Sequence, residues 1–405
     1  MRISGGSLLG FLKVIGPAWI VMIADVDAAS VVTAGESGAL FGYRMIFVLL
    51  MLILPLFIIQ EAAGRLGVVT GGGLASNIRS TYSKRIAVLA SIPMFLTDFL
   101  SYVVEYVGIA VGFEILGISP VISLPVVYVL HTLLVFTGSY RRTERILLVV
   151  TALLLFSYVL DAFLVKPDVH LLISTGLTPF QPYLSPNFAY LLAANVGAVV
   201  MPWMLFYQAG AVAQKELKQN QLTHERLETF LGAIASEGLM VSIVIVSAQM
   251  KAVNILSPAS LLNALVPLAG SYAFLVFGLG LVSASFLALV VISLASTWGV
   301  AESMGWRAKI GDRFRVARNF YIVYIFETLP AVIFPFLFTN LVSVMLNLMV
   351  VYVFVLVAPG ILTGLLCSNG HLMGKHVMSV SWRLIYWSML TLVVLAGLLA
   401  LPSLI

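Results

Sequence analysis

Apolar residues run along most of this chain, and short polar connections separate one apolar run from the next. Each run is about 20 residues long, the length that an α-helix needs to cross the hydrocarbon core of a bilayer. The pattern therefore predicts eleven membrane-spanning helices, at residues 13–40, 44–66, 86–113, 121–138, 145–165, 187–213, 228–250, 268–299, 317–337, 341–366 and 384–402.

Two of the predicted spans are interrupted. Span one carries Asp25 and Asp27 at its centre, where a carboxylate costs roughly 2.5–3.5 kcal/mol on insertion scales. Small residues follow, so we expect the helix to break and unwind at residues 25–30. Span six carries Pro202, which removes a backbone donor and clashes with the preceding turn. We expect a second break there, at residues 200–203.

The two breaks occupy equivalent places if the first ten spans form two halves of five. Interrupted helices in matching positions indicate an inverted-repeat transporter with its site near the bilayer midplane. The chain is then one transmembrane domain, residues 1–405. Its halves are expected at 13–165 and 187–366, with an added helix at 384–402.

Composition supports an all-α integral membrane protein. The 405 residues are 61% apolar and only 10% charged, whereas soluble domains carry about 25% charged residues. The single cysteine, Cys367, excludes an internal disulfide and a cysteine-based metal site. We expect neither an enzyme nor a resident cofactor, and no nucleic-acid partner. The expected partners are the lipid bilayer and a transported ion, and the oligomeric state stays open.

The charged residues are unevenly divided between the two sides of the predicted bundle. With a cytoplasmic N-terminus, the outer connections hold only 3 of the 22 Lys and Arg residues, namely Arg44, Lys166 and Lys251. Inner connections are normally the Lys- and Arg-rich ones. We therefore predict a multi-pass protein of the cell membrane with its N-terminus inside and its C-terminus outside.

The two breaks together offer ligands for a divalent cation. Asp27 is the favoured carboxylate, and Ser30 can add a hydroxyl oxygen. On span six, Ala198 can present a freed carbonyl and Met201 a thioether, a soft ligand that favours transition metals. Asp25 has three open interpretations: a second ligand, a water-facing charge, or the partner of a basic residue.

Other ionisable residues lie inside predicted spans and are functional hypotheses by default. Asp98 and Glu105 are seven residues apart on span three and so share a helix face. We consider them a proton or charge relay, or partners of Arg318 in an ion pair. Glu237 on span seven is a further candidate for the relay, and both it and Glu327 could instead pair within the bundle.

Several motifs of the chain, in order, resemble those of the natural resistance-associated macrophage protein (Nramp) family of divalent-metal transporters. The segments that carry the resemblance are Gly16-Pro17-Ala18, Asp27-Ala28-Ala29-Ser30, Phe41-Gly42-Tyr43, residues 64–71 and Gly197-Ala198-Val199-Val200-Met201-Pro202. The resemblance implies a LeuT-type fold, with five plus five helices in inverted repeat and an extra helix. It also implies import of a divalent metal that is held by Asp27, Ser30, Ala198 and Met201.

The chain departs from the family pattern at the site itself. Where the family has Asp-Pro-Gly-Asn, this chain has Ala-Ala-Ser after Asp27, and Trp203 stands where the Met-Pro-His motif has its histidine. An indole cannot take up a proton, so these departures leave proton coupling open. The interpretation we favour is import of Mn²⁺ or Fe²⁺ by alternating access. The alternatives are a Mg²⁺ carrier without proton coupling and, more remotely, a sodium- or proton-coupled symporter of an organic substrate such as an amino acid.

Overall fold

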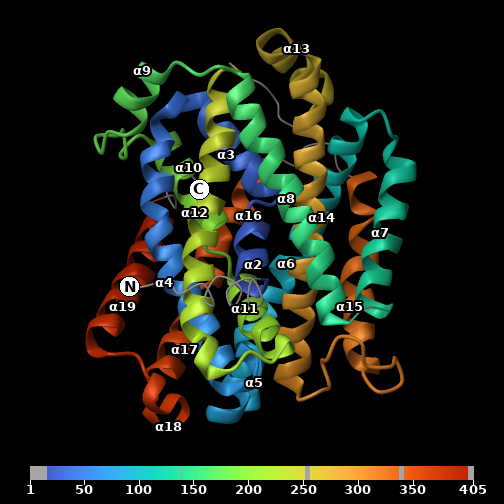
Figure 1. Ribbon diagram of the computed structural model, residues 1–405, viewed down its shortest axis with the longest axis vertical. Coiled ribbons are helices and arrows are strands. Elements are labelled where there is room, and N and C mark those ends of the chain that lie inside the picture. Colours follow the sequence, from blue (N-terminus) through green and yellow to red (C-terminus); the bar gives the residue numbers. More distant parts are fainter. Residues whose placement is uncertain (1–15, 138, 251–255, 337–341, 400–405) are drawn as a thin grey trace, which may run out of the picture.

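The computed structural model describes residues 16–137, 139–250, 256–336 and 342–399, and these residues form a bundle of helices (Figure 1). Predicted spans one to five correspond to α2 (Pro17–Ala24) with α3 (Ala28–Phe41), α4 (Ile46–Thr70), α6 (Lys84–Ile115), α7 (Pro120–Thr137) and α8 (Tyr140–Leu164). Spans six to eleven correspond to α10 (Pro186–Val199) with α11 (Pro202–Lys215), α12 (Leu222–Ala248), α14 (Ser271–Met304), α15 (Arg318–Ala331), α16 (Val342–Val355) with α17 (Val357–Cys367), and α19 (Val380–Leu398).

The remaining helical elements are short and connect the spans. They are η1 (Gly42–Met45), α5 (Leu74–Thr81), α9 (Val169–Leu171), η2 (Leu172–Gly176), η3 (Gln219–Gln221), α13 (Pro258–Ala269), η4 (Phe334–Phe336), α18 (Gly370–Met373) and η5 (Gly374–His376). Within the described ranges, nine helical segments are long and apolar enough to cross a membrane when α3, η1 and α4 are taken together. The chain is therefore a multi-pass membrane protein.

Both predicted breaks are present, and both are shorter than expected. The first spans residues 25–27 and the second residues 200–201. The prediction that the backbone unwinds through residue 30 is wrong, because residues 28–30 form the first turn of α3. Alanine is the best helix former, and Asp27 caps the new helix, so the chain resumes its helix at once.

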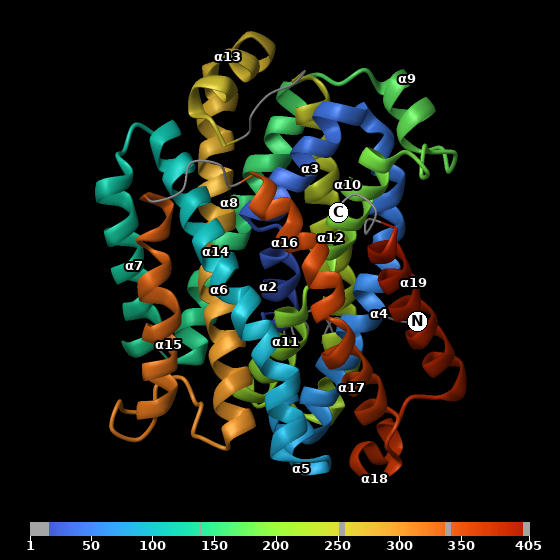
Figure 2. The ribbon, with the colours of Figure 1, turned by 180° about the vertical axis from the view of Figure 1, so that it is seen from behind.

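The broken spans lie at the centre of the bundle. α12 packs along α2, α3 and α4, while α14 packs along α6 and α8 (Figures 1 and 2). The second break lies in Pro186–Lys215, and 94% of the most apolar 18 residues of that span are buried. The corresponding share in Val380–Leu398 is 22%. The sixth span is thus enclosed by protein, whereas the eleventh lies at the periphery.

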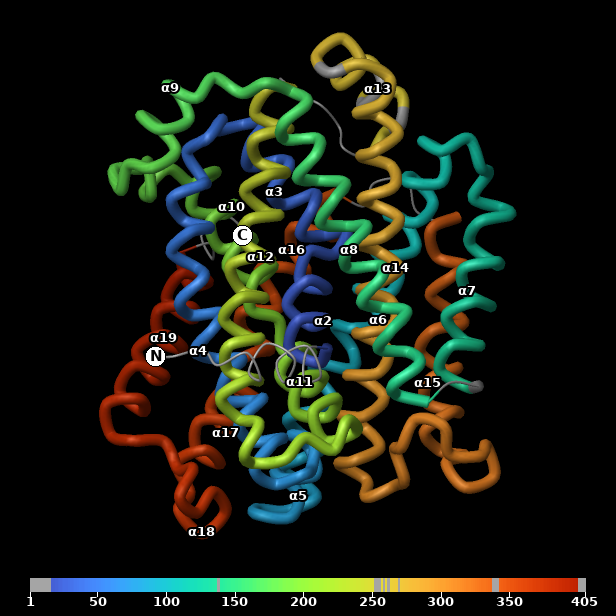
Figure 3. The backbone as a smooth tube through the Cα atoms, viewed as in Figure 1, coloured from blue at the N-terminus to red at the C-terminus, as the bar shows by residue number. Residues whose placement is uncertain are grey.

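The connections gather at two opposite ends of the bundle. α9 and α13 lie at the top of the tube in Figure 3, and α5 and α18 lie at the bottom together with the connection from α14 to α15. That lower connection carries four of the basic residues predicted to be cytoplasmic, namely Arg307, Lys309, Arg313 and Arg315. Lys251, predicted outside, lies beyond the described residues.

Candidate functional site

The two helix breaks meet inside the bundle. The Ser30 hydroxyl of α3 donates a hydrogen bond to the Ala198 carbonyl of α10, with 3.4 Å between the oxygens. Asp27, Ser30, Ala198 and Met201 all have 0% exposure. The structure therefore brings Asp27, Ser30 and Ala198 together in one buried region that is closed to solvent, and Met201 is buried three residues after Ala198, at the second break.

Asp27 has two distinct oxygens. Its Oδ1 accepts the Ser30 backbone N–H at 2.7 Å and so caps α3. Its Oδ2 is buried and has no hydrogen-bond partner among the described residues. A buried carboxylate oxygen without a donor is costly, and this one is free to bind a cation.

Glu105 contacts the same break from α6. Its Oε2 accepts the Ala28 backbone N–H at 3.1 Å, while its Oε1 is buried with no partner in the described chain. The first N–H groups of a helix carry partial positive charge. Glu105 and Asp27 together offset that charge at the start of α3, which would otherwise repel a cation. This position gives Glu105 a direct structural link to the break.

Helix α2 is held against α12 at both of its ends. The backbone N–H groups of Gly16 and Trp19 donate to Glu228 Oε1 at 2.6 and 2.8 Å. At the other end, the Ser236 hydroxyl donates to Asp25 Oδ2 at 3.0 Å. Asp25 is therefore anchored to α12 by one oxygen, and its other oxygen is buried without a described partner.

Met201 occupies the N-cap position of α11 at the second break without a side-chain capping bond, and Trp203 turns back toward it. The indole Nε1–H of Trp203 donates to the Met201 sulfur at 3.2 Å, and both side chains are fully buried. The thioether therefore already has one hydrogen-bond donor. Trp203 contributes no titratable nitrogen to the site.

The other predicted relay residues lie apart from Arg318. Asp98 Oδ1 accepts from the Tyr352 hydroxyl at 3.2 Å, and that hydroxyl also contacts Ser101. Glu237 is buried on α12, and neither of its oxygens has a partner among the described residues. Arg318 is exposed at the start of α15, and within the described ranges it forms no ion pair with Asp98 or Glu105.

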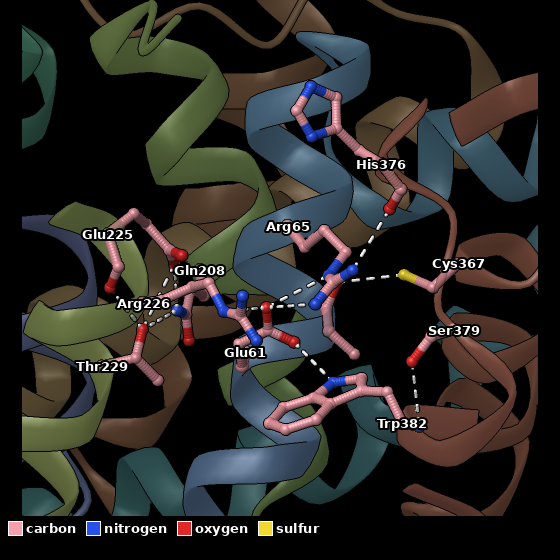
Figure 4. A network of polar contacts seen from close by, with 11 residues as sticks. Glu61, Arg65, Gln208, Glu225, Arg226, Thr229, Cys367, His376, Ser379 and Trp382 are labelled. Carbon is pink, nitrogen blue, oxygen red and sulfur yellow. Dashed lines mark hydrogen bonds and ion pairs between the residues drawn. The ribbon is translucent and has the colours of Figure 1, made fainter. Parts of the chain in front are cut away.

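A polar network inside the bundle escaped the sequence reasoning. Glu61 of α4 accepts from Arg65 at 2.7 Å and from Arg226 at 2.8 Å, and its second oxygen accepts the Trp382 indole N–H at 3.1 Å (Figure 4). The Arg226 guanidinium lies 5.0 Å above the Trp382 ring, and Arg65 also donates to the His376 carbonyl at 3.2 Å. The sequence could have indicated part of this network, because Glu61 and Arg65 stand four residues apart near the end of predicted span two and so lie on one helix face.

The donor set at the breaks is chemically mixed. In the part of the chain that the structure describes, no group of three or more His, Cys, Asp or Glu residues could hold a metal ion. A cation here would depend on one carboxylate of Asp27 together with a carbonyl, a hydroxyl and a thioether. These are acceptable ligands for a divalent transition metal.

Known proteins with similar sequences and folds are transporters. The family model described as natural resistance-associated macrophage protein-like matches residues 18–402. A divalent metal cation transporter MntH of Yersinia pestis (strain Pestoides F) is 28% identical over 298 residues, which cover 70% of this chain and 71% of the relative.

Solved structures of other transporters share the fold. The crystal structure of a manganese transporter of Eremococcus coleocola superposes with a TM-score of 0.81 at 18% identity, covering 100% of this chain and 89% of that one. MhsT, solved in complex with L-phenylalanine, gives a TM-score of 0.60 at 13% identity and covers both chains completely. The architecture is thus the LeuT-type fold, and the match over residues 18–402 shows that this chain belongs to the natural resistance-associated macrophage protein-like family.

Proposed function

We propose that this chain is a secondary transporter that imports divalent metal cations by alternating access. The observation that carries the proposal is the fully buried Oδ2 of Asp27 at the meeting point of the two broken helices, an oxygen for which the described residues supply no hydrogen-bond donor. The carbonyl ends of α2 and α10 also face these breaks, and the C-terminal end of a helix favours a cation. The names of the relatives, a divalent metal cation transporter and a manganese transporter, support the same cargo.

For the cargo we propose the Mn²⁺ and Fe²⁺ class, held by Asp27, Ser30, the Ala198 carbonyl and Met201. The thioether supports this choice, because soft ligands favour transition metals over Mg²⁺. A Mg²⁺ carrier would need a roomier site lined by oxygen atoms, with Asp25 turned toward the ion. Asp25 is instead hydrogen-bonded to Ser236 on α12 through one of its oxygens.

The alternative of an organic-substrate symporter finds less support at the same place. Asp27, Glu105 and Asp25 are all buried around the first break. An amino acid would bring its own carboxylate into that negative surrounding, and like charges at low dielectric repel strongly. A cation matches the charge of this surrounding.

Uptake into proteoliposomes tests the proposal. We expect the wild-type chain to transport Mn²⁺ in preference to Mg²⁺, and Asp27→Ala to lower Mn²⁺ uptake by more than about tenfold. Met201→Ala should reduce the preference for Mn²⁺ over Mg²⁺. Asp168→Ala is the control, since Asp168 caps α9 far from the breaks, and it should transport normally. Normal uptake by Asp27→Ala would refute the metal site.

Proton coupling is measured in the same vesicles with an internal pH dye. Trp203 cannot carry a proton, so we take the buried carboxylates around the first break as the first carriers to test. We propose transport without coupled acidification. Acidification that follows Mn²⁺ entry and disappears in Glu105→Gln would instead assign Glu105 to a proton pathway.

We further propose that residues 13–165 and 187–366 are inverted halves of one domain and that 384–402 is an addition. The support is the matched position of the breaks in α2–α3 and α10–α11, together with the peripheral place of α19.

A further inference from the structure

The second helix break contains a contact between a proposed ligand and its neighbour. Met201 and Trp203 flank Pro202, and the Trp203 indole N–H points at the Met201 sulfur with 3.2 Å between nitrogen and sulfur. Both side chains have 0% exposure. Within the described residues this is the one hydrogen bond recorded for the indole, so the thioether is what satisfies a buried N–H donor.

The contact has a consequence for the sulfur. An indole nitrogen can donate but cannot accept, so the bond draws on one of the sulfur's lone pairs. A metal that bound through this lone pair would leave the indole N–H buried without a partner, and an unsatisfied buried donor is costly. A metal could still bind through the second lone pair, but the hydrogen bond already draws electron density away from the same sulfur.

We propose that Trp203 is a specificity-determining residue that weakens Met201 as a soft ligand. This inference rests on the proposed function, because it concerns the metal that the site selects. The thioether alone would favour the most thiophilic ions, of which Cd²⁺ is a convenient probe. With the indole bonded to the sulfur, the oxygen atoms of Asp27, Ser30 and Ala198 count for more, and the preference moves toward harder divalent ions.

The ion-specific test compares Cd²⁺ and Mg²⁺ in the same proteoliposomes. Trp203→Phe keeps an aromatic ring and removes the N–H. We expect the ratio of Cd²⁺ to Mg²⁺ uptake to rise about two- to tenfold, the range that one hydrogen bond of ordinary net strength gives. The double variant Met201→Ala/Trp203→Phe should have the same Cd²⁺ to Mg²⁺ ratio as Met201→Ala, because the effect of the indole acts through the sulfur.

Trp298→Phe is the matched control. Trp298 is likewise a buried tryptophan, but its indole N–H donates at 2.9 Å to the carbonyl of Ala308, in the connection from α14 to α15. Its loss should leave the Cd²⁺ to Mg²⁺ ratio unchanged. Isothermal titration of purified protein with CdCl₂ gives a second readout, and Cd²⁺ affinity should rise in Trp203→Phe and not in Trp298→Phe.

A replacement of equal size guards against a folding defect in Trp203→Phe. Benzothienylalanine at position 203 keeps the bicyclic ring and exchanges the N–H for sulfur, so it removes the donor alone. An unchanged or lower Cd²⁺ to Mg²⁺ ratio in this variant would overturn the proposal, and so would an increase that persists in Met201→Ala. If wild type transports neither ion, and no divalent ion at all, the proposed function itself fails. If wild type transports these ions but the Cd²⁺ to Mg²⁺ ratio is the same in the variants at residue 203, only the inference about Trp203 fails.

Discussion

The two carboxylate oxygens of Asp27 have different surroundings. One oxygen caps α3 through the Ser30 N–H, and the other is buried without a partner among the described residues. An N-cap needs only an acceptor, and asparagine provides one as well as aspartate does. A cation site at this depth needs the negative charge as well. The observed capping role and the proposed ligand role can therefore be separated by a single substitution.

Asp27→Asn should preserve the fold and abolish transport. The amide oxygen retains the bond to Ser30, so we expect the free energy of unfolding to change by less than about 1 kcal/mol. Mn²⁺ uptake should fall by more than about tenfold, because the charge is lost. Thermal unfolding in detergent measures stability, and uptake in vesicles measures transport. Asp27→Ala removes the cap as well as the charge, so it should lower both stability and Mn²⁺ uptake. A stable Asp27→Asn protein with full uptake would show that the carboxylate serves the helix alone.

The helices differ in how they are tied to one another. α2 has both ends fastened to α12, by Glu228 and by Ser236. These two residues are eight apart, which is about 12 Å along a helix, and this matches the eight residues of α2. Glu61 of α4 joins α12 and α19 at a different place, through Arg226 and the Trp382 indole respectively.

Glu61→Gln should destabilise the bundle. The substitution leaves two guanidinium groups without their shared counter-charge, and breaking a mostly buried ion pair costs about 2 kcal/mol or more. Unfolding in detergent measures the loss. The control is Glu216→Gln, which breaks the exposed 3.3 Å pair with Lys309 and should cost less than about 1 kcal/mol. Equal costs for the two variants would show that the Glu61 network adds nothing beyond a surface pair.

The whole molecule has two chemically different ends. α9 and the connection from α14 to α15 lie at opposite ends of the bundle (Figure 2), and the second of these carries Arg307, Lys309, Arg313 and Arg315. The charge asymmetry predicts that this end faces the cytoplasm. α9 and the loop around it then face outward.

Cysteine labelling tests this orientation. In a Cys367→Ser background, which removes the buried native thiol, a membrane-impermeant maleimide should label His170→Cys in intact cells. Arg313→Cys should be labelled only after lysis, because the membrane shields it. Both positions are exposed in the structure, so access to the reagent depends on the side of the membrane alone. The reverse labelling pattern would invert the proposed topology and the direction of transport.

Local sequence patterns were enough to predict the spans and both breaks, while the ligand roles of Asp27 and Met201 stay predictions. Hydropathy and proline act locally, and a carboxylate in an apolar run is costly enough to be conspicuous. The length of the first break was overestimated, because the capping strength of Asp27 and the helix propensity of the two alanines outweighed the expected unwinding.

The surroundings of those residues depend on how the helices pack. The bonds from Ala28 to Glu105 and from Ser30 to Ala198 join residues that are 77 and 168 positions apart. No local pattern encodes such contacts, because they arise when separate helices pack together. The same holds for Glu228 and Ser236 against α2, and for the network around Glu61. A buried polar group needs a partner, but which partner it finds depends on how the bundle is assembled.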